Sequence, residues 1–152
     1  MSFTVEPIGW VTSARRDAID DDWGGVEATI TLADGYGDES VQGLDAFSHV
    51  EVIFVFDHVD PVTVTTGARR PRGNPDWPAV GIFAQRGKNR PNRLGLSTCE
   101  LIGVTGAVLR VRGLDAIDGT PVLDIKPYMT EFAPRRPVHQ PAWSHELMAN
   151  YY

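Results

Sequence analysis

The chain of 152 residues contains one cysteine, no long apolar run and no leader-like start. A single thiol, Cys99, excludes an intramolecular disulfide and a zinc site built from several cysteines. Its setting within Leu96–Leu101 favours a buried structural thiol over a nucleophile, because free cysteine is usually buried. No segment approaches the roughly 18 apolar residues that a membrane-spanning helix needs, and the N-terminus lacks a charged region followed by an apolar one. These absences favour a cytoplasmic protein with no membrane segment.

The sequence also lacks the common phosphate-binding loops. Neither GxGxxG nor GxxxxGK followed by Ser or Thr occurs, which disfavours the nucleotide-binding folds that use these loops. Lys and Arg are absent between residues 17 and 60, where twelve acids include Asp20, Asp21 and Asp22. The spacing of these three acids is not that of an EF-hand and no His accompanies them, so we expect a solvated acidic loop without a metal ion.

Positive charge is concentrated instead in residues 69–93, here called the basic window. It holds seven of the fourteen Lys and Arg residues, and Asp76 is its only acid. Arg86, Lys88 and Arg90 alternate with small or polar residues, and nearby glycines allow the backbone to approach a ligand closely. Guanidinium groups combined with glycines suit phosphate or carboxylate recognition. We therefore expect the basic window to bind an anionic ligand and not merely to balance an acidic protein with a net charge of −6.

Short β-rich segments separated by Gly, Pro, Asn and Asp dominate the pattern, and no strand is followed by the amphipathic helix of a βαβ unit. The sequence predicts a single domain over residues 1–152 with an all-β fold, a small antiparallel β-barrel of about seven or eight strands. Helical structure is expected only as a short turn near residues 41–47 and a C-terminal segment from Pro141 or Ser144 through Met148. The predicted strands are 3–11, 26–32, 50–56, 62–66, 80–83, 96–104, 108–114 and 122–125.

Three further clusters carry polar or aromatic groups suited to a binding site. The apolar strand 52–56 delivers Asp57 and His58 at its end, and its two apolar faces predict a central strand or a subunit contact. Asp118 and Gly119 predict a tight turn between two strands. Trp23 lies between acidic residues and two glycines, which makes it a candidate for stacking on a ring or a sulfonium.

These clusters, in this order, resemble the TsaA-like, or TrmO, family of tRNA methyltransferases. The resemblance covers residues 7–128 and leaves 129–152 as a C-terminal extension. It depends on three segments in register, which are Gly43–His49, Gly81–Ser97 and Asp118–Tyr128. It implies a β-barrel that forms a homodimer and binds S-adenosylmethionine. It further implies transfer of the sulfonium methyl to the exocyclic N6 of a threonylcarbamoylated adenosine beside the tRNA anticodon.

The resemblance also places the site residues. By position, the cofactor contacts of the family fall on Asp57, His58, Arg86, Leu96, Asp118, Gly119, Thr120 and Pro121. Asp57 or His58 would also accept the proton that the nitrogen sheds. Acceptor contacts are expected from Trp23, Lys88, Arg90, Asn92, Arg93, Lys126 and Tyr128. Methyl transfer from a sulfonium needs neither a metal nor a covalent intermediate, so the missing metal and nucleophile motifs agree with this chemistry.

Departures from the family pattern leave the acceptor open. An acidic stretch, Asp20–Gly25, replaces a Pro-Arg-Gln element, and Asp57-His58 replaces a His-Gln pair. Acids at an RNA-facing mouth would repel phosphate, so a small molecule or another nucleotide is the alternative methyl acceptor. A second alternative, of another class, is a β-barrel without catalytic activity that binds nucleic acid through the basic window.

Overall fold

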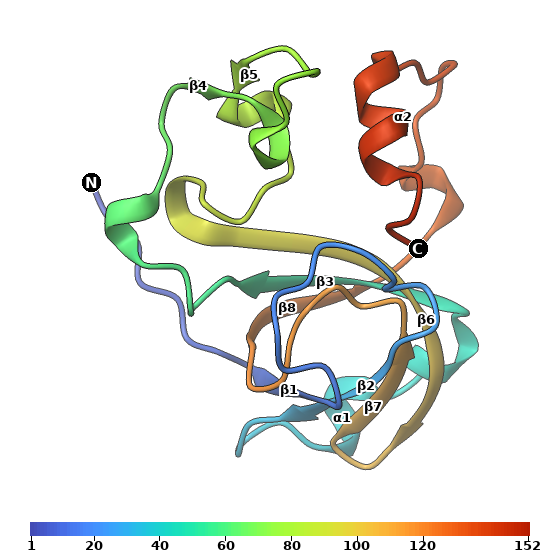
Figure 1. The fold of residues 1–152 in the computed structure, drawn as a ribbon. Coiled ribbons are helices and arrows are strands. Elements are labelled where there is room, and N and C mark those ends of the chain that lie inside the picture. Colours follow the sequence, from blue (N-terminus) through green and yellow to red (C-terminus); the bar gives the residue numbers. More distant parts are fainter.

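Six antiparallel strands form a closed barrel in the computed structural model, which describes all residues 1–152 (Figure 1). Around the barrel the order is β1-β2-β7-β6-β3-β8, and β1 closes the ring against β8. Closure leaves the barrel strands without an unpaired edge. The barrel strands are β1 (Gly9–Ser13), β2 (Glu27–Leu32), β3 (His49–Val55), β6 (Leu94–Thr105), β7 (Val108–Arg112) and β8 (Pro121–Pro127).

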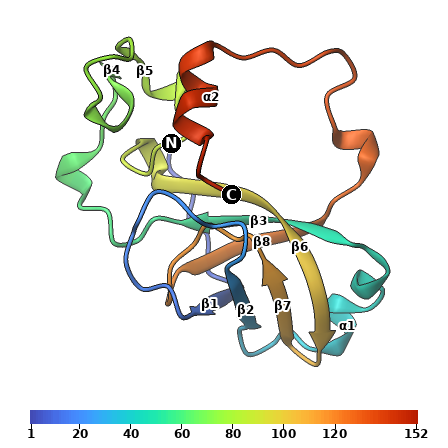
Figure 2. The same cartoon turned by 45° about the vertical axis from the view of Figure 1, so that its right-hand side comes forward.

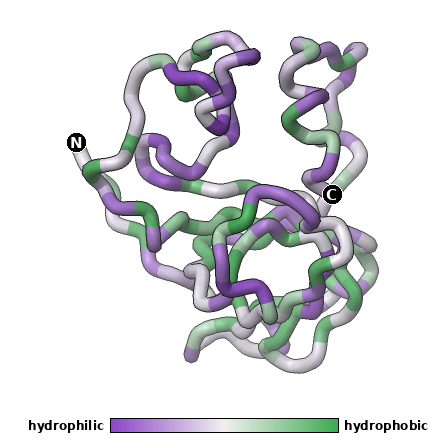
Figure 3. The backbone as a smooth tube through the Cα atoms, viewed as in Figure 1, coloured by the Kyte–Doolittle hydropathy of each residue, from purple (hydrophilic) through white to green (hydrophobic).

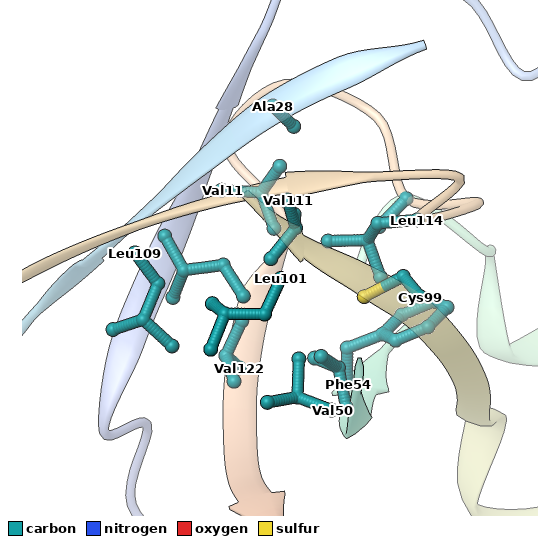
Figure 4. Packing of buried hydrophobic residues seen from close by; sticks show 13 residues of the cluster. Val11, Ala28, Val50, Phe54, Cys99, Leu101, Leu109, Val111, Leu114 and Val122 are labelled. Carbon is teal, nitrogen blue, oxygen red and sulfur yellow. The ribbon is translucent and has the colours of Figure 1, made fainter. Parts of the chain in front are cut away.

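Alternation along the strands separates the inside of the barrel from its outside. In β2, Ala28 and Ile30 are buried, whereas Glu27 and Thr31 are exposed. Period-two patterning of this kind points every second side chain inward. The inward side chains form one cluster of 13 buried residues, which includes Phe54 and Cys99 (Figure 4). Burial raises the pKa of Cys99 to about 12, which confirms the prediction of a buried structural thiol.

Strand β3 lies between β6 and β8, as its apolar composition predicts. Its inward residues Val50, Val52 and Phe54 are almost fully buried. The outward residues Ile53 and Val55 are half-buried, since only part of the outer surface is covered by other segments.

The remaining elements are short. The helices are α1 (Asp38–Val41) and α2 (Ala142–Met148), and the two-residue strands β4 (Ala68–Arg69) and β5 (Val80–Gly81) form a separate ribbon. Six 3₁₀-helical turns occur, at Leu44–Ala46, Pro61–Thr63, Pro71–Gly73, Ile82–Ala84, Pro91–Arg93 and Thr130–Phe132. The predicted C-terminal helix is confirmed, and the turn near residues 41–47 is divided between α1 and the first 3₁₀ turn.

The barrel class is confirmed, but the predicted strand number is too high. The segment 62–66 is not a strand, because Pro61 starts a 3₁₀ turn whose Val62 amide donates to the Asp60 side chain, 3.0 Å away. The segment 80–83 extends for two residues before it enters another 3₁₀ turn. The first strand begins at Gly9 and not near residue 3.

Two excursions stand on one side of the barrel. Residues 56–93 leave after β3 and return to β6, and α2 stands beside them, with the N-terminal half of β6 below both in the view of Figure 1 (Figures 1 and 2). Hydrophilic residues dominate the first excursion, whereas apolar residues follow the barrel strands (Figure 3). No helix in the structure has the length and apolar character that crossing a membrane requires.

We expect Gly95→Ala to destabilise the fold, because Gly95 pairs with Phe54 and a Cβ there would overlap the Phe54 ring. Overpacking of this kind costs about 1–3 kcal/mol of unfolding free energy. Gly103→Ala on the same strand is the matched control, since a Cβ at Gly103 meets nothing within 4 Å. Urea unfolding of both variants tests the prediction, and equal stability losses would contradict it.

Candidate functional site

A cavity of about 1460 Å³ lies between the two excursions and the outer surface of the barrel. Its walls come from the loop after β1, the end of β3, the basic window, the start of β6, the β7–β8 connection and the C-terminal residues from 140 onward. The cavity gathers nine of the residues predicted for the site, which are Trp23, Asp57, His58, Arg86, Lys88, Arg90, Asn92, Leu96 and Thr120.

Asp57 and His58 lie at the end of β3 and are both exposed. The His58 Nε2 atom is 3.7 Å from Asp57 Oδ2. Thr120 is buried and donates its hydroxyl to the Ile117 carbonyl at 2.7 Å, so its oxygen keeps acceptor capacity toward the cavity. The end of one barrel strand and the connection before β8 thus supply carboxylate, imidazole and hydroxyl groups to one space.

Several arginines of the basic window hold the irregular backbone in place. Arg86 donates to the Leu96 carbonyl at 2.7 Å, Arg90 to the Gln85 carbonyl at 2.8 Å, and Arg93 to the Val59 carbonyl at 2.8 Å. Each of these guanidinium groups retains further donors, because Arg carries five N–H bonds. The positive charge therefore both shapes the cavity wall and remains available to a ligand.

The side chain of Arg69 lies close to Gly87, one of the glycines of the basic window. A Cβ at Gly87 would lie 2.7 Å from Arg69 Nη2, so a larger residue there would push this guanidinium aside. The Gln85 side chain, which is buried, donates to the carbonyls of Arg69 and Val80 at 2.9 and 2.8 Å. These bonds join the Gln85 side chain of the basic window to the β4–β5 ribbon.

The acidic loop is tied to the basic window by ion pairs. Arg72 Nη2 lies 2.8 Å from Asp21 Oδ1, and Arg72 Nε lies 3.7 Å from Asp20 Oδ2. The hydrogen bond to Asp21 is the main cause that raises the pKa of Arg72. Part of the acidity expected to repel phosphate at the mouth is therefore neutralised within the chain.

Trp23, the sequence's candidate for stacking, is buried in the structure. Trp23 borders the cavity but is only 4% exposed, and the Arg15 guanidinium carbon lies 3.9 Å from its ring centroid. The same guanidinium donates to the carbonyls of Ile19, Asp21 and Asp22, which fixes the loop. One face of the indole is thus already occupied by a cation.

Asp115 forms a polar centre that the sequence did not reveal. The hydroxyls of Ser97 and Tyr151 both donate to its carboxylate, although the residues come from β6 and from the segment after α2. Burial raises the pKa of Asp115, and burial together with the Asp115 charge raises that of Tyr151. The Trp23 amide donates to the Tyr151 carbonyl at 2.7 Å. The apolar residues on either side of Asp115 are the only signal of its burial in the sequence.

The structure does not bring every predicted residue to the cavity wall. The turn at Asp118 docks on β1, since Asp118 Oδ1 accepts from the Ser13 amide at 2.9 Å and the Gly119 amide donates to the Val11 carbonyl at 2.8 Å. Pro121, the first residue of β8, pairs with β1. Arg93 also lies outside the lining.

Lys126 and Tyr128 lie near the opposite end of β3 from the cavity. Lys126 pairs in register with Glu51 and forms an ion pair of 2.6 Å with Asp124, and the Tyr128 amide donates to the His49 carbonyl at 3.0 Å. Nowhere in the chain are three His, Cys, Asp or Glu side chains grouped so that they could hold a metal ion.

Comparison with solved structures supports the fold and its family. A crystal structure of TrmO from Pseudomonas aeruginosa superposes with a TM-score of 0.74 and 28% sequence identity, over 91% of this chain and 62% of that one. A second TrmO crystal structure gives the same TM-score and identity.

Similar sequences carry two kinds of name. A tRNA (adenine(37)-N6)-methyltransferase from Homo sapiens is 37% identical over 74% of this chain and 25% of its own length. A probable S-adenosyl-L-methionine-binding protein from Methanothermobacter thermautotrophicus is 38% identical over 84% of this chain and 91% of its own. The chain spans about a quarter of the length of the mammalian relatives it matches.

The resemblance noted in the sequence is confirmed by a family model. The model describes the N-terminal domain of tRNA-methyltransferase O and matches residues 21–133, which include the basic window, β3, β6 and the β7–β8 connection. Because this match covers most of the chain and the archaeal relative aligns over nearly its whole length, the chain belongs to the tRNA-methyltransferase O N-terminal domain family.

Proposed function

We propose that this protein is an S-adenosylmethionine-dependent methyltransferase that methylates N6 of an adenosine in tRNA, and that the acceptor is a threonylcarbamoylated adenosine beside the anticodon. The observation that carries the proposal is one cavity that joins Asp57, Arg86, Leu96 and Thr120 to the cations Lys88 and Arg90. The names of the relatives support it, since they include both S-adenosylmethionine-binding proteins and tRNA adenine-N6 methyltransferases.

The donor set of the cavity fits the cofactor. Arg86 uses one nitrogen for the Leu96 carbonyl and keeps donors that match a carboxylate. The exposed Asp57 carboxylate suits an ammonium group, and the Thr120 oxygen suits a hydroxyl. Asp118, Gly119 and Pro121 remain proposed contacts, although in this conformation they face β1.

The residues of this chain have mainly to bind, orient and accept a proton. The bound cofactor supplies an electrophilic methyl group on a sulfonium. Arg86 and Thr120 would fix the position of its polar groups, which aligns the methyl with the attacking nitrogen. Asp57 or His58 would accept the proton from that nitrogen, and their exposure lets the proton pass to solvent.

RNA is favoured as the acceptor because cations line the cavity and Arg72 neutralises part of the acidic loop. The second candidate, a small-molecule acceptor, is favoured by Asp20, which borders the cavity with a side chain that stays 63% exposed.

A tRNA substrate would also imply a cytoplasmic protein. Residues 129–152 belong in our proposal to the same domain, since Glu146 accepts a bond of 2.7 Å from Trp77 Nε1.

We also propose a homodimer. Outward apolar residues of β3 and β6 pair side by side, with Val55 opposite Leu94 and Ile53 opposite Leu96. Leu94 and Leu96 are 42% and 45% exposed, so an apolar surface borders the cavity. A second copy could cover this surface and bring Lys126 and Tyr128 to the site. Sedimentation equilibrium tests this proposal, and a mass of 16.7 kDa at micromolar concentration would contradict it.

We expect Arg86→Ala to weaken binding of S-adenosylmethionine and of its demethylated product about ten- to a hundredfold, because a charge-assisted contact to the shared carboxylate is lost. Titration calorimetry measures both affinities. Arg136→Ala is the control, since Arg136 is exposed and lies away from the cavity. Unchanged affinity in a folded Arg86→Ala protein would remove Arg86 from the site, and no binding by the wild type would favour the barrel that only binds nucleic acid.

We expect tRNA from a strain that lacks the gene to lose the N6-methylated nucleoside, which mass spectrometry of digested tRNA measures. The purified protein should restore it, and Lys88→Ala should flatten the salt dependence of tRNA binding by about 0.7–0.9 of a log unit per log unit of salt. Lys88 is chosen because its side chain forms no hydrogen bond or ion pair within the chain, unlike the side chains of Arg90 and Arg93. Unaltered nucleosides in the deletion strain would contradict tRNA as the acceptor and favour the small-molecule acceptor.

A further inference from the structure

Phe83 is a solvent-exposed aromatic residue at the cavity. It lines the cavity, yet it is 78% exposed, and it lies in the middle of the 3₁₀ turn Ile82–Ala84. A large apolar ring left in water at the edge of a cavity marks a surface for a partner or ligand more often than a packing role.

The turn that carries Phe83 is anchored on both sides. Ile82, the residue before it, is 1% exposed and its amide donates to the Gly67 carbonyl at 2.9 Å. Gln85, two residues later, is buried and binds the carbonyls of Arg69 and Val80 through its side chain. The ring is therefore presented by a fixed piece of backbone, which reduces the entropy lost when a ligand covers it.

The surroundings of Phe83 match a nucleic acid. Arg86, Lys88 and Arg90 follow it on the same loop, and all three line the same cavity. An aromatic ring that lies among cations is the usual arrangement for unpaired nucleotides, because the ring stacks on a base while the cations contact the phosphates.

The cavity is also larger than the pockets that usually hold one small ligand. Its volume is about 1460 Å³, whereas pockets for a single drug-sized ligand measure about 300–1,000 Å³. An enzyme that modifies a base must take that base out of its stack. The cavity has room for a cofactor together with an extruded nucleotide.

We propose that Phe83 stacks on an unpaired base of the acceptor RNA, next to the base that receives the methyl group, and so holds the RNA loop open over the cavity. This proposal rests on the proposed function, since it names the residue that binds the substrate of that same site. It assigns to Phe83 the stacking role that the sequence suggested for Trp23, whose ring is buried against Arg15.

The test compares Phe83→Ala and Phe83→Trp with Phe132→Ala. Phe132 is also 78% exposed and also belongs to a 3₁₀ turn, but it does not line the cavity. The probe is an RNA hairpin with the anticodon loop of a tRNA that the wild type methylates, with 2-aminopurine placed beside the acceptor base. Stacking on an aromatic ring quenches this fluorescent base.

We expect Phe83→Ala to weaken hairpin binding roughly five- to a hundredfold and to lose the quenching, because a stacked base is given up. Phe83→Trp should retain both, and Phe132→Ala should match the wild type. The affinity for S-adenosylmethionine should stay unchanged in all three variants.

Three results would overturn the proposal. Retained hairpin affinity and quenching in Phe83→Ala would remove the stacking role. Equal losses of cofactor and hairpin binding would show that the ring merely supports the cavity. A change from dimer to monomer in sedimentation would identify Phe83 as a subunit contact. Failure of the proposed function is recognised separately, because the wild type would then methylate no tRNA.

Discussion

The pairing of Val55 with Leu94 is the constraint on which the site depends. These two residues end the ladder between β3 and β6, so residues 56–93 must leave the barrel and return at one point. The ladder is long and continuous, which fixes both ends of the excursion firmly. Everything that the excursion carries, including the basic window, is thereby held above the outer surface of β6. The excursion is mostly hydrophilic (Figure 3), and the cavity lies between it, the C-terminal segment and the barrel.

Within the excursion, hydrogen bonds from arginines replace regular secondary structure. Arg70, Arg90 and Arg93 each donate to backbone carbonyls within residues 56–93, and Arg86 donates to the Leu96 carbonyl of β6. A segment rich in Pro and Gly leaves many carbonyls without strand or helix partners, and such groups need donors when they are partly buried. Each guanidinium satisfies one or two of them and still has donors to spare. Structure and ligand recognition therefore use the same side chains, so each arginine has fewer free N–H donors for an anion but keeps its positive charge.

The sequence predicted the barrel because alternation in β2 and the apolar character of β3 are local signals that tertiary structure reinforces. It failed where a local contact outweighed strand propensity, as at Val62, whose amide bonds to the Asp60 side chain in a turn begun by Pro61. The site was predicted only in part for a different reason. Arg15 packs on Trp23 within one loop, and Tyr151 bonds to Asp115 from a distant part of the chain. Composition gives no sign of either pair.

The two walls of the cavity differ in how they are held. Arg86, Leu96 and Thr120 lie on the barrel or directly above it, within the residues that match the family model. The facing wall comes from α2 and the residues after it, which lie beyond that match and are fixed by Trp77 bonding to Glu146 and by Tyr151 bonding to Asp115. Asp115 accepts bonds from both Ser97 of β6 and Tyr151, so one buried carboxylate joins the walls. Because burial already raises its pKa, loss of either donor would leave a poorly compensated charge at the junction. The groups suited to a cofactor thus lie on the barrel or on the excursion that β3 and β6 anchor, while the opposite wall is attached through a few polar contacts.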